Sequence, residues 1–266
     1  MCIILMLWEN AMNGEMYQIC CITTAAKKAL QDGTGILYTP SEYVFRTEFR
    51  FLQEQELFIR KDFIAYNVED WFGHCKQKKL MDIKFLAPVW VSDRMILGYS
   101  NMSQSSIVCF YEGGNVTYFT AKWEFDPTRK WTVLYTENEW PDPPSEKPHF
   151  EDHTEDFART LEKIKGLAVQ LGFEGFAQTF QDAWDLLIGR KEAADVDKLA
   201  LPQLPAKHRQ MFAAASKADV FGAMGSWNDS PPYVAHERGL DAEYDRLSAE
   251  LLKNIRLAVL YAVNEW

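Results

Sequence analysis

The sequence predicts an α+β fold, in which an antiparallel β-meander in the N-terminal half packs with a helical C-terminal half of about four helices. Before residue 140, apolar and polar residues alternate with a period of two in several stretches, as in half-buried strands. After residue 149 the apolar residues instead recur every three or four positions, as on amphipathic helices. Residues 140–148, between the two patterns, contain four prolines, which cannot continue a helix or a central strand.

These patterns divide the chain into four predicted segments. They are a possible N-terminal extension at 1–15, a β-rich α+β lobe at 16–140, a proline-rich connector at 141–148 and a helical lobe at 149–266. The first segment opens with the apolar run Met1 to Trp8, which Glu9 ends. This run is too short to span a bilayer and lacks the basic flank of a signal peptide. We therefore expect residues 1–15 to be an extension or an added strand.

The elements of the N-terminal half follow from local signals. Residues 44–51 alternate as a strand does, and helices are expected at 23–31 and 68–80. Residues 106–111 and 116–123 form a predicted hairpin, because Gly113 and Gly114 can supply the positive φ angles of a tight turn. A second turn at 126–130 leads into a strand at 131–135. The short loops favour antiparallel pairing.

The C-terminal half contains four predicted helices. The apolar stripe from Phe157 to Leu171 steps by four and three residues, and Gly172 ends it. A second stripe runs from Phe176 to Leu187, a third helix covers 204–220, and the last covers 241–263. Four helices with short joins predict a bundle.

Composition and charge restrict the classes of partner. The chain has 28 Lys and Arg against 38 Asp and Glu, a net charge of −10. A nucleic-acid or anionic-membrane partner is therefore disfavoured, because binding phosphates requires basic surface. The five cysteines are odd in number and form no CxxC pair, which fits a reducing cytoplasm better than a disulfide framework. Serine-hydrolase, dinucleotide and P-loop motifs are absent, so no catalytic residue is assigned and no cofactor is expected.

Acidic residues gather around the connector. From Glu137 to Asp156 there are eight acids and one lysine, enough to attract a basic partner by long-range steering. The steering residues predicted here are Glu137, Glu139, Asp142, Glu146, Glu151 and Asp152.

The same region offers an alternative site. His149 and His153 are spaced i, i+4, and on one helix face two such imidazoles could hold a zinc-like ion beside nearby carboxylates. The sequence is not HExxH, and a helix starting between the two histidines would spoil this geometry. A solvated, acidic helix start is the competing interpretation.

A second candidate binding surface lies at 222–237, where aromatic and polar residues crowd a loop that contains two prolines. Exposed Trp and Tyr on a rigid loop are typical of binding surfaces. The residues predicted to bind are Trp227, Asn228, Asp229, Tyr233 and His236. In the alternative interpretation Trp227 packs inward, and Asn228 and Asp229 only cap a turn.

Three functions stay open from the sequence. The first is a non-catalytic intracellular protein-binding module, such as an acidic inhibitor or immunity-type protein that masks a basic partner. The second is a metal-assisted hydrolase with a site at the lobe junction. The third is a structural role as a homo-oligomer.

Overall fold

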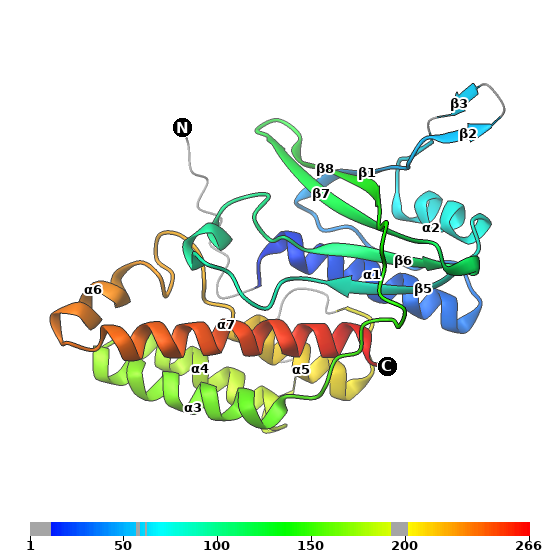
Figure 1. The fold of residues 1–266 in the computed structure, drawn as a ribbon. Helices are drawn as coiled ribbons and strands as arrows, with labels where there is room; N and C mark the ends of the chain where they lie inside the picture. The colour runs from blue at the N-terminus through cyan, green and yellow to red at the C-terminus, as the bar shows by residue number, and fades with distance from the viewer. Residues whose placement is uncertain (1–11, 57–58, 62, 193–201) are drawn as a thin grey trace.

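The computed structural model describes residues 12–56, 59–61, 63–192 and 202–266, and it confirms the α+β fold. A six-stranded sheet stands beside a group of helices from the C-terminal half, with the long helix α7 running along the boundary (Figure 1). The strand order is β4-β1-β8-β7-β6-β5. The strands are β1 (Val44–Arg50), β4 (Ile64–Ala65), β5 (Leu80–Leu86), β6 (Ser106–Tyr111), β7 (Val116–Asp126) and β8 (Lys130–Glu139).

Part of the predicted meander is present. Strands β6, β7 and β8 follow one another as antiparallel neighbours, and β5 extends them on the other side of β6. Gly113 and Gly114 have φ angles of 85° and 86° in the turn between β6 and β7. The short strands β2 (Glu54–Glu56) and β3 (Ile59–Lys61) form a separate hairpin that projects from the sheet (Figure 1).

A strictly antiparallel meander is wrong, because β1 lies parallel to β8. Phe49 of β1 is opposite Tyr135 of β8, and the two rings stack with centroids 4.7 Å apart. On its other side the Phe49 ring stacks on Trp71 of helix α2 (Val68–Gln77), at 4.8 Å. Alternation in sequence decides which side chains share a face, and it leaves the order of the strands open.

Helix α1 (Gly14–Asp32) begins well before the helix expected at 23–31. Asn13 caps it by accepting a hydrogen bond from the backbone N–H of Glu15. Met12 is only 1% exposed and Met16 is fully buried, so the described part of the expected extension, residues 12–15, lies in or beside the core. Because α1 is buried over much of its circumference, it carries no simple amphipathic stripe. Residues 1–11 of that expected extension lie outside the described residues.

The four helices predicted after residue 149 are confirmed. They are α3 (Thr154–Leu171), α4 (Glu174–Leu187), α5 (Ala206–Ala218) and α7 (Asp241–Asn264), and a short helix α6 (Ser230–Glu237) precedes α7. Gly172 ends α3 with a φ of 80°. Within the described residues, no helix is both long and apolar enough to cross a membrane.

The two halves share buried surface. Helices α1 and α2 cover the sheet face that carries Phe49 and Tyr135, and α1 also contacts α7. Helix α7 packs on α3 and α5, and its last turns reach strand β5. One continuous cluster of buried apolar residues includes side chains from the sheet and from the bundle. The lobe boundaries given above stay a prediction.

Candidate functional site

The candidate site is the connector, which we define as residues 140–153, between the end of β8 and the start of α3. It includes the predicted proline-rich segment 141–148. In Figure 1 it leaves the sheet at β8 and runs past β5 toward the helices. It contains no helix or strand, so side-chain contacts must hold it in place.

The first half of the connector is attached to the sheet. Trp140 donates its backbone N–H to Val116 of β7 (3.2 Å), and its ring meets that of Tyr118 edge-on at 6.4 Å. Further along, the ammonium of Lys147 pairs with Asp82 of β5 at 2.8 Å. These contacts hold the proline-rich stretch at two points against the sheet.

The second half is attached to the end of α7. Glu265 receives a hydrogen bond from the backbone N–H of Phe150 (3.3 Å) and contacts His149 Nδ1 at 2.6 Å. Its carboxylate also pairs with Lys84 of β5 at 3.0 Å. Burial opposes ionisation of Glu265, but its contacts with Lys84 and His149 outweigh burial and hold the pKa below its ordinary value. A single carboxylate thus joins the connector, the sheet edge and helix α7.

Most of the predicted steering residues lie on the surface. Glu139, Asp142, Glu146, Glu151 and Asp152 are all exposed. Asp152 forms an ion pair with Lys207 at 2.9 Å. The other four carboxylates form no ion pair among the described residues. Glu155 in the first turn of α3 is also exposed without an ion pair in the described part of the chain.

Glu137 does not belong to this surface, and its assignment as a steering residue is wrong. It is 2% exposed and points to the inner face of β8. Its carboxylate accepts hydrogen bonds from the Thr117 hydroxyl (2.7 Å) and the backbone N–H of Leu52 (2.9 Å), and Lys78 lies 3.7 Å away. Strand alternation is the physical reason, because Glu137 lies on the same buried face of β8 as Val133 and Tyr135. Glu139, at the end of the strand, is exposed.

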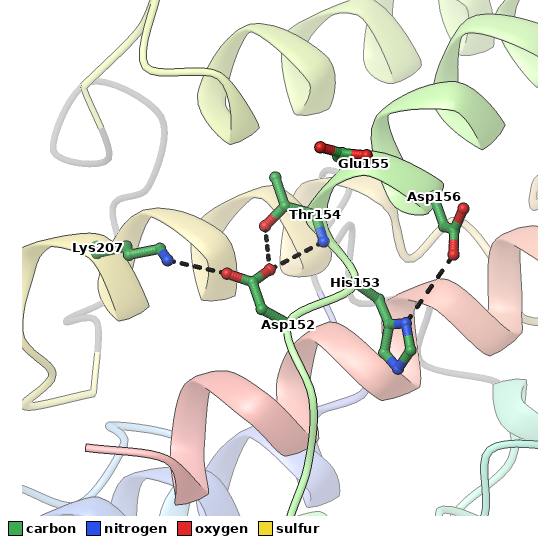
Figure 2. Close-up of a pocket in the computed structure, with 6 residues that line it drawn as sticks. All are labelled: Asp152, His153, Thr154, Glu155, Asp156 and Lys207. Carbon is green, nitrogen blue, oxygen red and sulfur yellow. Dashed lines mark hydrogen bonds and ion pairs between the residues drawn. The ribbon is translucent and has the colours of Figure 1, made fainter.

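An open cavity of about 430 Å³ lies where the connector enters α3. Figure 2 shows its lining, with Asp152 turned toward Lys207 and His153 turned toward Asp156. Asp152 accepts hydrogen bonds from the backbone N–H (3.0 Å) and from the hydroxyl of Thr154, the first residue of α3. Partial burial raises the pKa of Asp152, but these bonds and Lys207 outweigh it and keep the pKa below its ordinary value.

The paired-histidine arrangement is not formed. His149 binds Glu265, whereas His153 lies just before α3, with its Nδ1 4.0 Å from Asp156. Helix α3 starts at Thr154, so the i, i+4 spacing does not place the two rings on one helix face. Nowhere in the described ranges do three or more His, Cys, Asp or Glu side chains gather as metal ligands would.

Trp227 lies in the core, as the alternative interpretation of its loop expected, and its assignment as a contact residue is wrong. The side chain is 0% exposed, and its ring contacts Phe176 and Phe180 of α4 and Tyr244 of α7. The indole N–H donates to Ser248 at 2.9 Å. An indole that fills a gap between α4 and α7 cannot meet a partner.

The other residues of this loop divide between core and surface. Asn228 is buried and donates toward the Gly222 carbonyl at 3.4 Å. Asp229 accepts from the Gly225 N–H at 2.8 Å, which stabilises the turn before α6. Tyr233 is 66% exposed, and the exposed His236 pairs with Asp241 at 2.9 Å. The continuous aromatic surface expected here is reduced to one tyrosine and one histidine on α6.

The sequence assigned no role to the residues at the end of α7. Asn264 and Glu265 contact residues 85 and 149, which are more than one hundred positions away. No local pattern marks such long-range contacts. The nearest signal is that the last helical stripe continues almost to the terminus, which predicts a packed rather than a frayed end.

Comparison with protein-family models, with curated proteins and with solved structures finds no match for this chain. Function is therefore inferred from the geometry of the connector.

Proposed function

We propose that this chain is a non-catalytic protein-binding module whose connector meets a basic protein partner. An acidic inhibitor or immunity-type protein that masks a basic partner is the concrete form of the proposal. The observation that carries it is a run of exposed carboxylates on and beside the connector, which the sheet and α7 hold in place. They are Glu139, Asp142, Glu146, Glu151 and Glu155, none of which has an ion-pair partner in the described part of the chain.

Attachment of the connector supports this role energetically. Binding costs free energy for each segment that must be ordered, and a segment already held in place avoids part of that cost. Trp140, Lys147, His149, Phe150 and Asp152 of the connector make polar contacts with the body. The carboxylates between and around them are left for a partner.

Charge supports the proposal kinetically. A protein of net charge −10 with a local row of carboxylates attracts a basic protein from a distance and raises the rate of encounter. The free thiols Cys20, Cys21, Cys75 and Cys109 agree with a reducing, cytoplasmic location for this encounter.

The proposal is tested by capture from the native host, with cross-linking and identification of the bound protein. The test variant neutralises three connector carboxylates: Asp142→Asn, Glu146→Gln and Glu151→Gln. A matched control neutralises three exposed acids elsewhere on the helices: Glu162→Gln, Glu237→Gln and Glu243→Gln. Each variant changes the net charge from −10 to −7 (−10 + 3).

We expect the wild type and the control to retain the same basic protein at low salt, and the connector variant to lose most of it. Equal capture by all three chains would contradict the proposal, as would recovery of small molecules without a protein. Recovery of a second copy of this chain alone would favour the homo-oligomer instead.

A further inference from the structure

The last three residues, Asn264–Trp266, form what we call the C-terminal clasp. Lys27 of α1 donates to the Asn264 carbonyl, and its ammonium lies 5.2 Å from the Trp266 ring centroid. Gln31, one turn further along α1, donates to the Trp266 carbonyl at 3.1 Å. The clasp therefore contacts α1 in addition to β5 and the connector, and the connector depends on it through Glu265.

His208 of α5 also holds the clasp in place. Its Nε2 donates a hydrogen bond to the Glu265 carbonyl at 2.7 Å, and its ring stacks on Tyr261 of α7 with centroids 5.3 Å apart. The other ring nitrogen, Nδ1, is buried and has no hydrogen-bond partner among the described residues. The ring is thus bound in its neutral form, with the single proton on Nε2.

A second proton on His208 has no place in this arrangement. It would sit on Nδ1, which is buried and has no acceptor among the described residues, and this costs free energy. Burial is the main cause that lowers the pKa of His208 below its ordinary value. The Glu265 carbonyl opposes this effect, and the charges of Lys207 and Lys27 add to it.

Titratable groups from several neighbouring elements lie near this ring. Helix α5 contributes Lys207, α1 contributes Lys27, and α7 contributes Tyr261 and Glu265. The connector contributes Asp152, which attracts a charged imidazole, and the two lysines oppose this attraction. His149 of the connector and Lys84 of β5 both contact Glu265. Because the pKa of Glu265 is held low, its carboxylate stays ionised at mildly acidic pH. Among the contacts of the clasp, the one that a second proton disfavours is that of His208, because its Nδ1 has no acceptor among the described residues.

We propose that His208 is a proton-operated release for the C-terminal clasp. Protonation of Nδ1 drives the ring toward water, breaks its hydrogen bond to Glu265 and separates it from Tyr261. The loosened end of α7 then holds His149 and Phe150 less firmly, and the connector gains freedom. This inference does not depend on the proposed function, since it concerns contacts within the chain.

The test is hydrogen–deuterium exchange on the full chain at about pH 7.5 and about pH 5, corrected for intrinsic exchange rates. The peptides that report on the device cover residues 141–150 and 260–266. In the wild type we expect the corrected exchange of both to rise several-fold on acidification. His208→Gln keeps an N–H donor but does not titrate. The ratio of its corrected exchange rate at about pH 5 to that at about pH 7.5 should therefore be close to one. His236→Gln, at an exposed histidine on α6, should behave as the wild type does.

The readout is the ratio of the corrected exchange rates at the two pH values. A variant that exchanges faster at both pH values is therefore still informative. A wild-type ratio of about one would overturn the proposal. So would a His208→Gln ratio as large as that of the wild type. Neither result involves a partner, so failure here leaves the proposed function standing.

Discussion

Asn264 pairs with the backbone of Phe85 as a neighbouring strand would. Its side-chain carbonyl accepts from the Phe85 N–H at 2.9 Å, and its amide donates to the Phe85 carbonyl at 2.8 Å. Phe85 lies on β5, at the edge of the sheet, where unpaired backbone groups invite association with other strands. One side chain from the end of α7 thus satisfies this edge position and joins the sheet to the bundle.

Asn264→Ala should destabilise the fold by about 2–4 kcal/mol, because it leaves a buried N–H and a buried C=O without partners. The free energy of unfolding in denaturant measures this. Asn138→Ala is the control, since that side chain lies on the partly exposed face of β8 and its loss should cost under about 1 kcal/mol. A loss at Asn264 no larger than that at Asn138 would contradict the pairing.

Trp227→Ala should destabilise the fold by about 3–5 kcal/mol, since it removes a large buried ring from between α4 and α7. Thermal unfolding measures the effect. Tyr233→Ala, at the exposed aromatic of the same region, should stay within about 0.5 kcal/mol of wild type. Equal effects of the two changes would contradict the placement of Trp227 in the core.

Gly98→Ala should destabilise by about 1–3 kcal/mol. A Cβ at Gly98, at the end of the 3-10 helix Arg94–Gly98, would come within 2.3 Å of the backbone nitrogen of Ala223. Gly73 in α2 has no such neighbour within 4 Å, so Gly73→Ala should instead stabilise by up to about 1 kcal/mol. If both substitutions changed the free energy of unfolding in the same direction, this would contradict the close approach of Gly98 to Ala223.

Asp219, at the end of α5, should make stability depend on pH. Burial raises its pKa from 3.8 to about 6, against the lowering effect of Arg256. The folded state therefore holds the proton more tightly than the unfolded state. The resulting stability is fully present below about pH 3.8 and is lost as pH rises through about 6.

Asp219→Asn removes this titration. The free energy of unfolding of the variant minus that of the wild type should therefore increase by up to about 3 kcal/mol from pH 4 to pH 7.5. Denaturant unfolding across this pH range measures it. A difference that does not change with pH would contradict the buried, proton-binding state of Asp219.

The helices of the C-terminal half were predictable because each buries a single stripe. Phe157 and Leu161, for example, belong to a helical repeat of apolar residues that can be read directly from the sequence. Helix α1 was predicted too short, because a helix buried over much of its circumference shows no such period. The parallel placement of β1 beside β8 was not predictable either, since the Phe49–Tyr135 stack joins residues far apart in sequence.

The candidate site was predictable only as a charge pattern. Most carboxylates of the acidic run are exposed, and their role in steering a partner stays a prediction. Glu137 is buried, because strand alternation turns it inward. The spacing of His149 and His153 was misleading, because the helix starts after both. The contacts of Glu265 with Lys84 and His149 join residues more than one hundred positions apart, which no local signal records.

The association rate between this chain and its captured protein partner tests the central claim most directly. It should be measured at about 20 mM and about 300 mM salt, where screening differs strongly. We predict that the wild type and the Glu162/Glu237/Glu243 control associate at least about tenfold faster at low salt. The Asp142/Glu146/Glu151 variant should associate slowly, with much less dependence on salt. A salt-independent rate that is the same for all three chains would contradict a binding role for the connector.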